Sequence, residues 1–92
     1  MEEILKVKSC GEVCRVHDAA TQGVISKRVV ELDGWPEDGT GGFRAMAWGS
    51  TAETDLCTGD IILANLILRT YGEMNLITLA GFVKIGHETM DN

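Results

Sequence analysis

Short runs of β-branched and aliphatic residues recur along this chain, and polar segments that contain glycine separate them. Five of these runs have the length and residue types of β-strands, and they cover residues 4–16, 25–32, 43–49, 61–69 and 75–85. The first run carries Gly11 in its middle, where a glycine permits a sharp bend or a bulge. The apolar positions form short runs rather than a helical stripe, so the pattern predicts an all-β core.

The polar segments predict the connections. Residues 18–23 form a first loop, and residues 33–42, with four glycines and the only proline, form the longest connection. The triplet Tyr71-Gly72-Glu73 predicts a tight turn that joins the last two strands into a hairpin. The polar end of the chain, residues 87–92, is expected to fray.

One short helix is expected between the third and fourth strands. Ser50-Thr51-Ala52-Glu53 fits a capping box, in which the Ser50 hydroxyl binds the Glu53 amide and the Glu53 carboxylate reaches back. A helix is therefore predicted to begin at this segment. Gly59 is predicted to end it before the fourth strand.

The third strand has two distinct faces. Alternation places Arg44, Met46 and Trp48 on one face, and Phe43, Ala45 and Ala47 on the other. The charge of Arg44 marks its face as the outer one, so Trp48 is predicted to point outward. In the alternative interpretation, a bulge shifts the register and buries Trp48 in the core.

The order of the elements predicts a fold. A strand that ends in an aromatic residue, a short helix, a Gly59-Asp60 turn and another long strand follow one another as in a five-stranded Greek-key barrel of the OB type. A length of 92 residues allows one domain, which we expect to span residues 1–92 with an ordered part of roughly residues 3–87. In such barrels an exposed aromatic residue often serves as a platform for nucleic-acid bases.

The segment from the third to the fifth strand resembles the bacterial single-stranded DNA-binding protein family and the related primosomal replication protein, both OB-folds. The motifs that carry this resemblance are Trp48-Gly49, Thr51-Ala52-Glu53, Gly59-Asp60 and Leu68-Arg69-Thr70. It extends more loosely to the first strand, where Lys6 precedes Gly11-Glu12-Val13, and to Trp35 in the second loop.

The resemblance implies a function and a set of site residues. Trp48 and Trp35 would stack on bases, Arg44 and Lys6 would contact phosphates, and Arg69 and Tyr71 would lie at the base and tip of a hairpin that wraps the strand. The implied partner is single-stranded DNA, with RNA as an alternative, and the implied role is that of an accessory protein in replication or repair. Replication proteins are further implied partners, although we expect the protein to lack the acidic recruiting tail of the family's oligomer-forming members.

The charge balance supports a second hypothesis. Eight Lys and Arg residues against fourteen Asp and Glu residues give a net charge of −6, which excludes a uniformly basic DNA-binding surface. The alternative function is an OB module for protein interaction or self-assembly, as a dimer or tetramer, with Met46 and Trp48 in its interface. Under this alternative, Trp35 plugs one end of the barrel, Arg44 and Arg69 are merely solvated, and Lys27-Arg28 protects a sheet edge.

The remaining chemistry-bearing residues predict neither an enzyme nor a metal or cofactor site. His17 and His87 are isolated, and the glycines at 39–42 lack the Lys and Ser or Thr of a phosphate-binding loop. Three cysteines without dense spacing predict buried structural thiols rather than disulfides. The longest apolar run is broken by Asn65 and the chain begins with an acidic Met1-Glu2-Glu3, so we expect a cytoplasmic protein that does not enter a membrane. The resemblance implies that it is bacterial.

Overall fold

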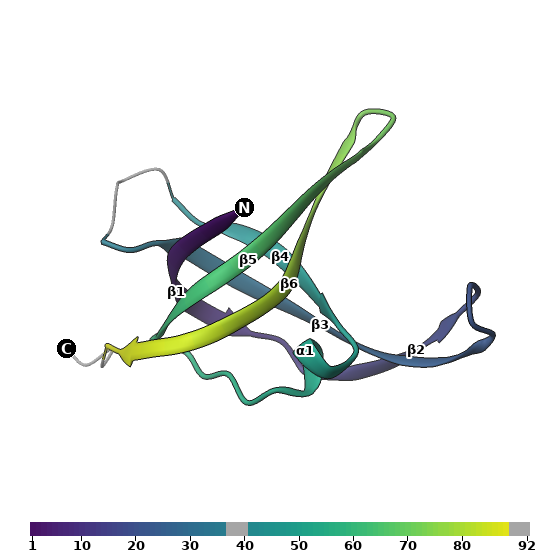
Figure 1. Ribbon diagram of the computed structural model, residues 1–92, viewed down its shortest axis with the longest axis horizontal. Coiled ribbons are helices and arrows are strands. Elements are labelled where there is room, and N and C mark those ends of the chain that lie inside the picture. The colour runs from purple at the N-terminus through teal and green to yellow at the C-terminus, as the bar shows by residue number, and fades with distance from the viewer. Residues whose placement is uncertain (37–40, 89–92) are drawn as a thin grey trace.

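The structure, a computed structural model, describes residues 1–36 and 41–88 of the 92-residue chain. The described part is mostly β-sheet, which confirms the all-β prediction (Figure 1). Its elements are β1 Glu2–Cys10, β2 Cys14–Asp18, β3 Gly23–Gly34, β4 Phe43–Trp48, α1 Ser50–Glu53, β5 Asp60–Tyr71 and β6 Met74–His87. The short helix lies between β4 and β5, as the sequence predicted.

Six strands appear where five were predicted, because the first apolar run is interrupted at Gly11. The Gly11 amide donates a hydrogen bond of 2.8 Å to the Val29 carbonyl, and a Cβ atom on Gly11 would lie 3.0 Å from that oxygen. The glycine therefore permits a close approach of the two backbones. β1 pairs with both β3 and β5, whereas β2 pairs with β3 only.

The sheet closes on itself. Its order is β1-β5-β6-β4-β3-β2, and β1 also pairs with β3, so five of the strands form a ring. The pairs are antiparallel except for β4 and β6, which run parallel where Met46 and Ala47 lie opposite Thr78 and Leu79. This parallel contact brings the end of β4 beside the β5–β6 hairpin.

The core fills the inside of the ring. The buried apolar residues are Leu5, Val7, Val30, Leu32, Ala45, Ala47, Ala52, Leu56, Ile62, Ala64, Leu66 and Leu79. They come from β1, β3, β4, β5 and β6, with Ala52 contributed by the helix and Leu56 by the loop after it. In β4 the inward residues are Ala45 and Ala47, and Phe43 is half-buried against the same core, as the alternation predicted.

Two hairpins project from the closed part of the sheet (Figure 1). In the first, Asp18 accepts hydrogen bonds of 3.0 Å from the Ala20 amide and the Thr21 hydroxyl, which fixes the predicted loop between β2 and β3. In the second, Gly72 and Glu73 join β5 to β6, and Gly72 has a positive φ of 61°. A two-residue hairpin turn that starts at positive φ favours glycine in this place, so the predicted turn is confirmed.

The helix begins at Ser50 as expected, but its predicted cap and its predicted end are wrong. Gly49, with φ of 62°, occupies the N-cap position and no side chain caps the helix, so Ser50 and Glu53 do not form a capping box. Ser50 lies inside the helix, where its carbonyl accepts a bond of 3.0 Å from the Thr54 amide. The helix ends at Glu53, well before Gly59, whose amide instead donates to the Val7 carbonyl at 2.8 Å.

The structure also bears on three smaller expectations. His87, expected in a frayed end, belongs to β6, while residues 89–92 and the middle of the long connection, residues 37–40, lie outside the described part. The cysteines carry free thiols as predicted, but Cys14 and Cys57 are exposed rather than buried. Within residues 1–36 and 41–88, no helix has the length and apolar character needed to cross a membrane.

A buried carboxylate fastens the end of β6 to the start of β5. Asp60 accepts a bond of 2.8 Å from the Cys57 amide, and its two oxygens lie 2.9 Å from His87 Nδ1 and 3.2 Å from Lys84 Nζ. Burial raises the pKa of Asp60, but the hydrogen bonds from the Cys57 amide, His87 and Lys84 together lower it by more. The pKa of Asp60 therefore lies below its ordinary value of 3.8. The ionised form of Asp60 is therefore favoured by folding.

Acid is expected to destabilise the protein through this carboxylate. A carboxyl group whose pKa is lower in the folded state contributes stability above its ordinary pKa of 3.8, and this contribution disappears as the pH falls through the lowered pKa. Asp60→Asn should reduce the free energy of unfolding at pH 6 by about 1–3 kcal/mol and make it less sensitive to acid. Urea unfolding between pH 6 and pH 2.5 measures both effects. Asp55→Asn is the control, because that exposed carboxylate lies 3.5 Å from the same Lys84; an equal effect of both variants would contradict the prediction.

Candidate functional site

The outer face of β3 and β4 carries two of the six predicted site residues, Arg44 and Trp48. Arg44, Met46 and Trp48 point outward while Ala45 and Ala47 are buried, as the alternation predicted. Trp48 keeps 37% of its surface exposed, so the alternative in which a bulge buries it in the core is wrong. Across the strands, Met46 lies opposite Val29, and Trp48 lies opposite Lys27. The outer face therefore has a largely apolar centre.

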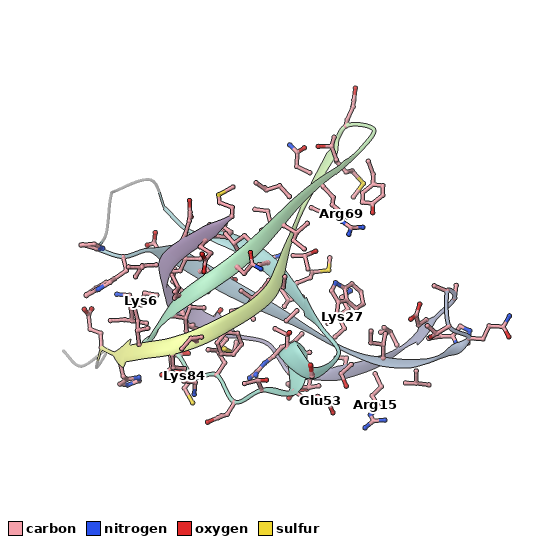
Figure 2. The ribbon with its side chains drawn as sticks, viewed as in Figure 1. Lys6, Arg15, Lys27, Glu53, Arg69 and Lys84 are labelled. Atoms are coloured by element: carbon pink, nitrogen blue, oxygen red, sulfur yellow. The ribbon has the colours of Figure 1, made fainter. Side chains whose placement is uncertain are left out.

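A hollow of about 270 Å³ lies where this face meets the β5–β6 hairpin. We call it the Trp48 hollow, and it is lined by Met46, Trp48, Arg69, Tyr71, Leu76, Ile77 and Thr78. The parallel contact between Met46 and Thr78 explains how it forms, because it holds the hairpin against the outer edge of β4. In Figure 2, Arg69 lies on the projecting part of the hairpin, on the side that faces Lys27.

Three of the six predicted site residues meet in this hollow. Trp48 comes from β4, whereas Arg69 and Tyr71 come from the far end of β5. Tyr71 is exposed by 56%, so its ring is accessible to a ligand in the hollow that Trp48 also lines. The structure thus places two aromatic side chains and one guanidinium group around a single space.

Lys27 belongs to the same site, although sequence reasoning interpreted it as a possible edge-protecting residue. Its ammonium group lies 5.5 Å from the centre of the Trp48 ring, within the range of a cation–π interaction. The two residues are direct partners across β3 and β4. Only the strand register reveals this pairing, because 21 residues separate Lys27 from Trp48 in the sequence.

Arg44 shares the outer face but lies farther along β4. It is the register partner of Glu31, and its Nε atom lies 3.7 Å from a Glu31 carboxylate oxygen. Both side chains are exposed, so this ion pair adds little to stability. The Glu31 carboxylate does, however, reduce the attraction of Arg44 for an anion.

Lys6 and Trp35 lie together at another place. Lys6 is only 5% exposed, its Nζ atom lies 3.2 Å from Glu88 Oε1, and it sits 5.5 Å from the centre of the Trp35 ring. Trp35 is half-buried, and its amide donates to the Ile4 carbonyl at 3.2 Å. Gly34, which precedes Trp35, lies seven residues along β3 from Lys27, or about 23 Å. The structure therefore does not bring Lys6 and Trp35 to the Trp48 hollow.

The chemistry of the Trp48 hollow is that of a site for a planar group with a neighbouring negative charge. Its lining is mainly apolar and aromatic, it contains no acidic residue, and Arg69 and the Thr78 hydroxyl supply hydrogen-bond donors. Elsewhere in residues 1–36 and 41–88, no group of three or more His, Cys, Asp or Glu side chains is placed to hold a metal ion. Comparison of the sequence with known protein families and with curated protein sequences finds no match.

Proposed function

We propose that this protein binds single-stranded nucleic acid, with single-stranded DNA as the first ligand to test, on the outer face of β4 and the β5–β6 hairpin. The observation that carries the proposal is the convergence of Trp48, Tyr71 and Arg69 on one hollow of about 270 Å³. An aromatic ring offers a stacking surface to any base, and stacking is worth about 1–3 kcal/mol per base. Because every base has such a surface, the binding would tolerate most sequences.

The charges around the hollow favour this ligand despite the net charge of −6. Lys27 on β3 lies over the Trp48 ring, and Arg69 on β5 lines the hollow, so a backbone phosphate next to a base stacked at Trp48 would find a cation. Lys27 covers one face of the indole. The other face is then the surface proposed for the base.

The order of the strands and the position of the helix support the same proposal. The ring consists of the five strands β1, β3, β4, β5 and β6, and along the chain the helix falls between the third and the fourth of them. We interpret this ring as a Greek-key barrel of the OB type, in which oligonucleotides bind beside the two long hairpin loops. A role in replication or repair, next to replication proteins, follows from the resemblance described above and forms part of the proposal.

Titration with oligothymidylate at several salt concentrations tests the function. Tryptophan fluorescence should be quenched on binding, because one of the two tryptophans is the proposed platform. If Lys27 and Arg69 each neutralise one phosphate, the logarithm of the binding constant should fall against the logarithm of salt concentration with a slope of about −1.4. Absence of quenching and of binding at low salt would overturn the proposal. Parallel titration with oligouridylate distinguishes DNA from RNA.

Self-association is the second candidate function, and a specific surface favours it. Ile4, Leu63 and Val83 are direct neighbours across β1, β5 and β6, and all three are exposed. They form an uncharged apolar row on a part of the sheet other than the Trp48 hollow. Apolar rows of this kind are typical of surfaces that pack against another protein chain.

A charge placed in this row should dissociate an oligomer. Val83→Glu is expected to convert a dimer or tetramer into monomers without lowering stability, because Val83 is 63% exposed in the single chain. Val24→Glu is the matched control, since Val24 is 64% exposed but lies on the β2–β3 hairpin. Sedimentation velocity of the three proteins measures the effect. A wild-type protein that is monomeric at high concentration would exclude this second function.

A further inference from the structure

A second hollow opens on the same outer face, at the break between β1 and β2. It has a volume of about 360 Å³, and it is lined by Gly11, Glu12, Cys14, Val16, Lys27 and Val29. We call it the Gly11 hollow. Cys14 lies opposite Lys27, and Lys27 lies opposite Trp48, so one row of side chains crosses β2, β3 and β4 from this hollow to the Trp48 ring.

Lys27 connects the two hollows. Its side chain lines the Gly11 hollow, while its ammonium group lies 5.5 Å above the centre of the Trp48 ring. Two strand spacings separate Cys14 from Trp48, which is about 10 Å. Two cationic residues of the described part line the hollows, Arg69 and Lys27. Of these two, Lys27 is the one that lies between the hollows.

Hydrogen bonds fix the backbone at Gly11, which lines the Gly11 hollow. The Gly11 amide bonds to the Val29 carbonyl at 2.8 Å, and the Gly11 carbonyl accepts a bond of 2.8 Å from Arg28 Nε. The same guanidinium group reaches the carbonyls of Thr54 and Leu56, at 3.5 and 3.4 Å, and thereby ties Gly11 to the loop after α1. A Cβ atom on Gly11 would lie 3.0 Å from the Val29 carbonyl oxygen, so a glycine fits this part of the lining.

We infer that a strand bound at Trp48 continues over Lys27 into the Gly11 hollow, so that the ligand is a run of at least two unpaired nucleotides. This inference rests on the proposed function. One base occupies each hollow, and the phosphate that links them lies on Lys27. Val16 and Val29 give the Gly11 hollow apolar walls for a base, whereas Glu12 repels phosphate and keeps the backbone on the Lys27 side. Bases paired in a duplex cannot enter either hollow without leaving the stack.

The thiol of Cys14 provides a direct test, because it is exposed and lines the Gly11 hollow. Reduced protein is treated with N-ethylmaleimide alone or with thymidine monophosphate or oligothymidylates of two, four and eight nucleotides. Mass spectrometry of peptides then gives the alkylation rate of each cysteine. Cys57 is the internal control, since it is exposed but lies in the loop before β5. Cys10 should react slowly throughout, because partial burial raises the pKa of its thiol.

The expected result is that the oligonucleotides slow alkylation of Cys14 severalfold, that thymidine monophosphate does not, and that Cys57 is unaffected. Tryptophan fluorescence in the same samples reports on the Trp48 hollow. Quenching without protection of Cys14 at any length would overturn the path and leave the proposed function standing. Equal slowing of Cys14 and Cys57 would also overturn the proposed path, because a general change in the protein would then explain the slower alkylation. Neither quenching nor protection would overturn both proposals.

Discussion

Replacing Trp48 by alanine is expected to weaken the binding of oligothymidylate by about 5- to 150-fold, the equivalent of losing 1–3 kcal/mol of base stacking. The substitution removes the indole ring, which lines the hollow and lies under the Lys27 ammonium group. The fold should survive, because 37% of the Trp48 surface is already exposed and the buried residues of β4 are Ala45 and Ala47. Anisotropy of a fluorescently labelled oligonucleotide measures the affinity without depending on the tryptophan that has been removed.

Trp35 supplies the matched control for this experiment. It is the other tryptophan of the chain, but it packs on Lys6 rather than in the Trp48 hollow. Trp35→Phe should therefore leave the affinity within about twofold of the wild type, since a change this small corresponds to less than 0.5 kcal/mol. Equal losses in the two variants would contradict a base platform at Trp48. The salt dependence should be unchanged in Trp48→Ala, because Lys27 and Arg69 remain.

Local patterns in the sequence predicted much of the fold. The alternation of Arg44, Met46 and Trp48 with small apolar residues identified the outer face of β4, because side chains in a strand alternate strictly between the two faces. Glycine and polar segments likewise marked the turns at residues 18–23 and 72–73. Gly11 marked the place where the first apolar run is interrupted, but the sequence did not show that this interruption produces two strands.

The composition of the candidate site depended on contacts that local patterns do not encode. Arg69 and Tyr71 reach Trp48 only through the parallel pairing of Met46 with Thr78, which joins segments about thirty residues apart. Lys27 joins the site through strand register alone. Lys6 and Trp35 appeared suitable from residue type, yet tertiary packing directs Lys6 to Glu88. Residue type and spacing thus suggested the chemistry, and pairing between distant strands determined which residues share a site.

Gly59→Ala is expected to be among the most destabilising single substitutions in the chain, at about 2–5 kcal/mol of the free energy of unfolding. Gly59 has φ of 95°, where a side chain strains the backbone, and a Cβ atom there would collide with the backbone carbonyl of Glu88. Gly59 also makes two backbone hydrogen bonds. Its amide donates to the Val7 carbonyl, and its carbonyl accepts from the Glu88 amide. The carbonyl cannot retreat without breaking this junction of β1, β5 and the end of β6. Thermal and urea unfolding measure the loss.

Two other glycines separate the causes of this effect. Gly72 also has a positive φ, of 61°, but a Cβ atom on it would meet nothing within 4 Å, so Gly72→Ala should lose only the strain, about 1 kcal/mol. Gly81 has neither a positive φ nor a neighbour within 4 Å, so Gly81→Ala should be neutral or stabilising by up to about 1 kcal/mol. For a domain of this size, 1 kcal/mol corresponds to about 4–8 °C in Tm, so the three variants should be clearly resolved. A Gly59→Ala protein no less stable than Gly72→Ala would mean that the backbone at Glu88 yields freely, and that the end of β6 is not fixed to the start of β5.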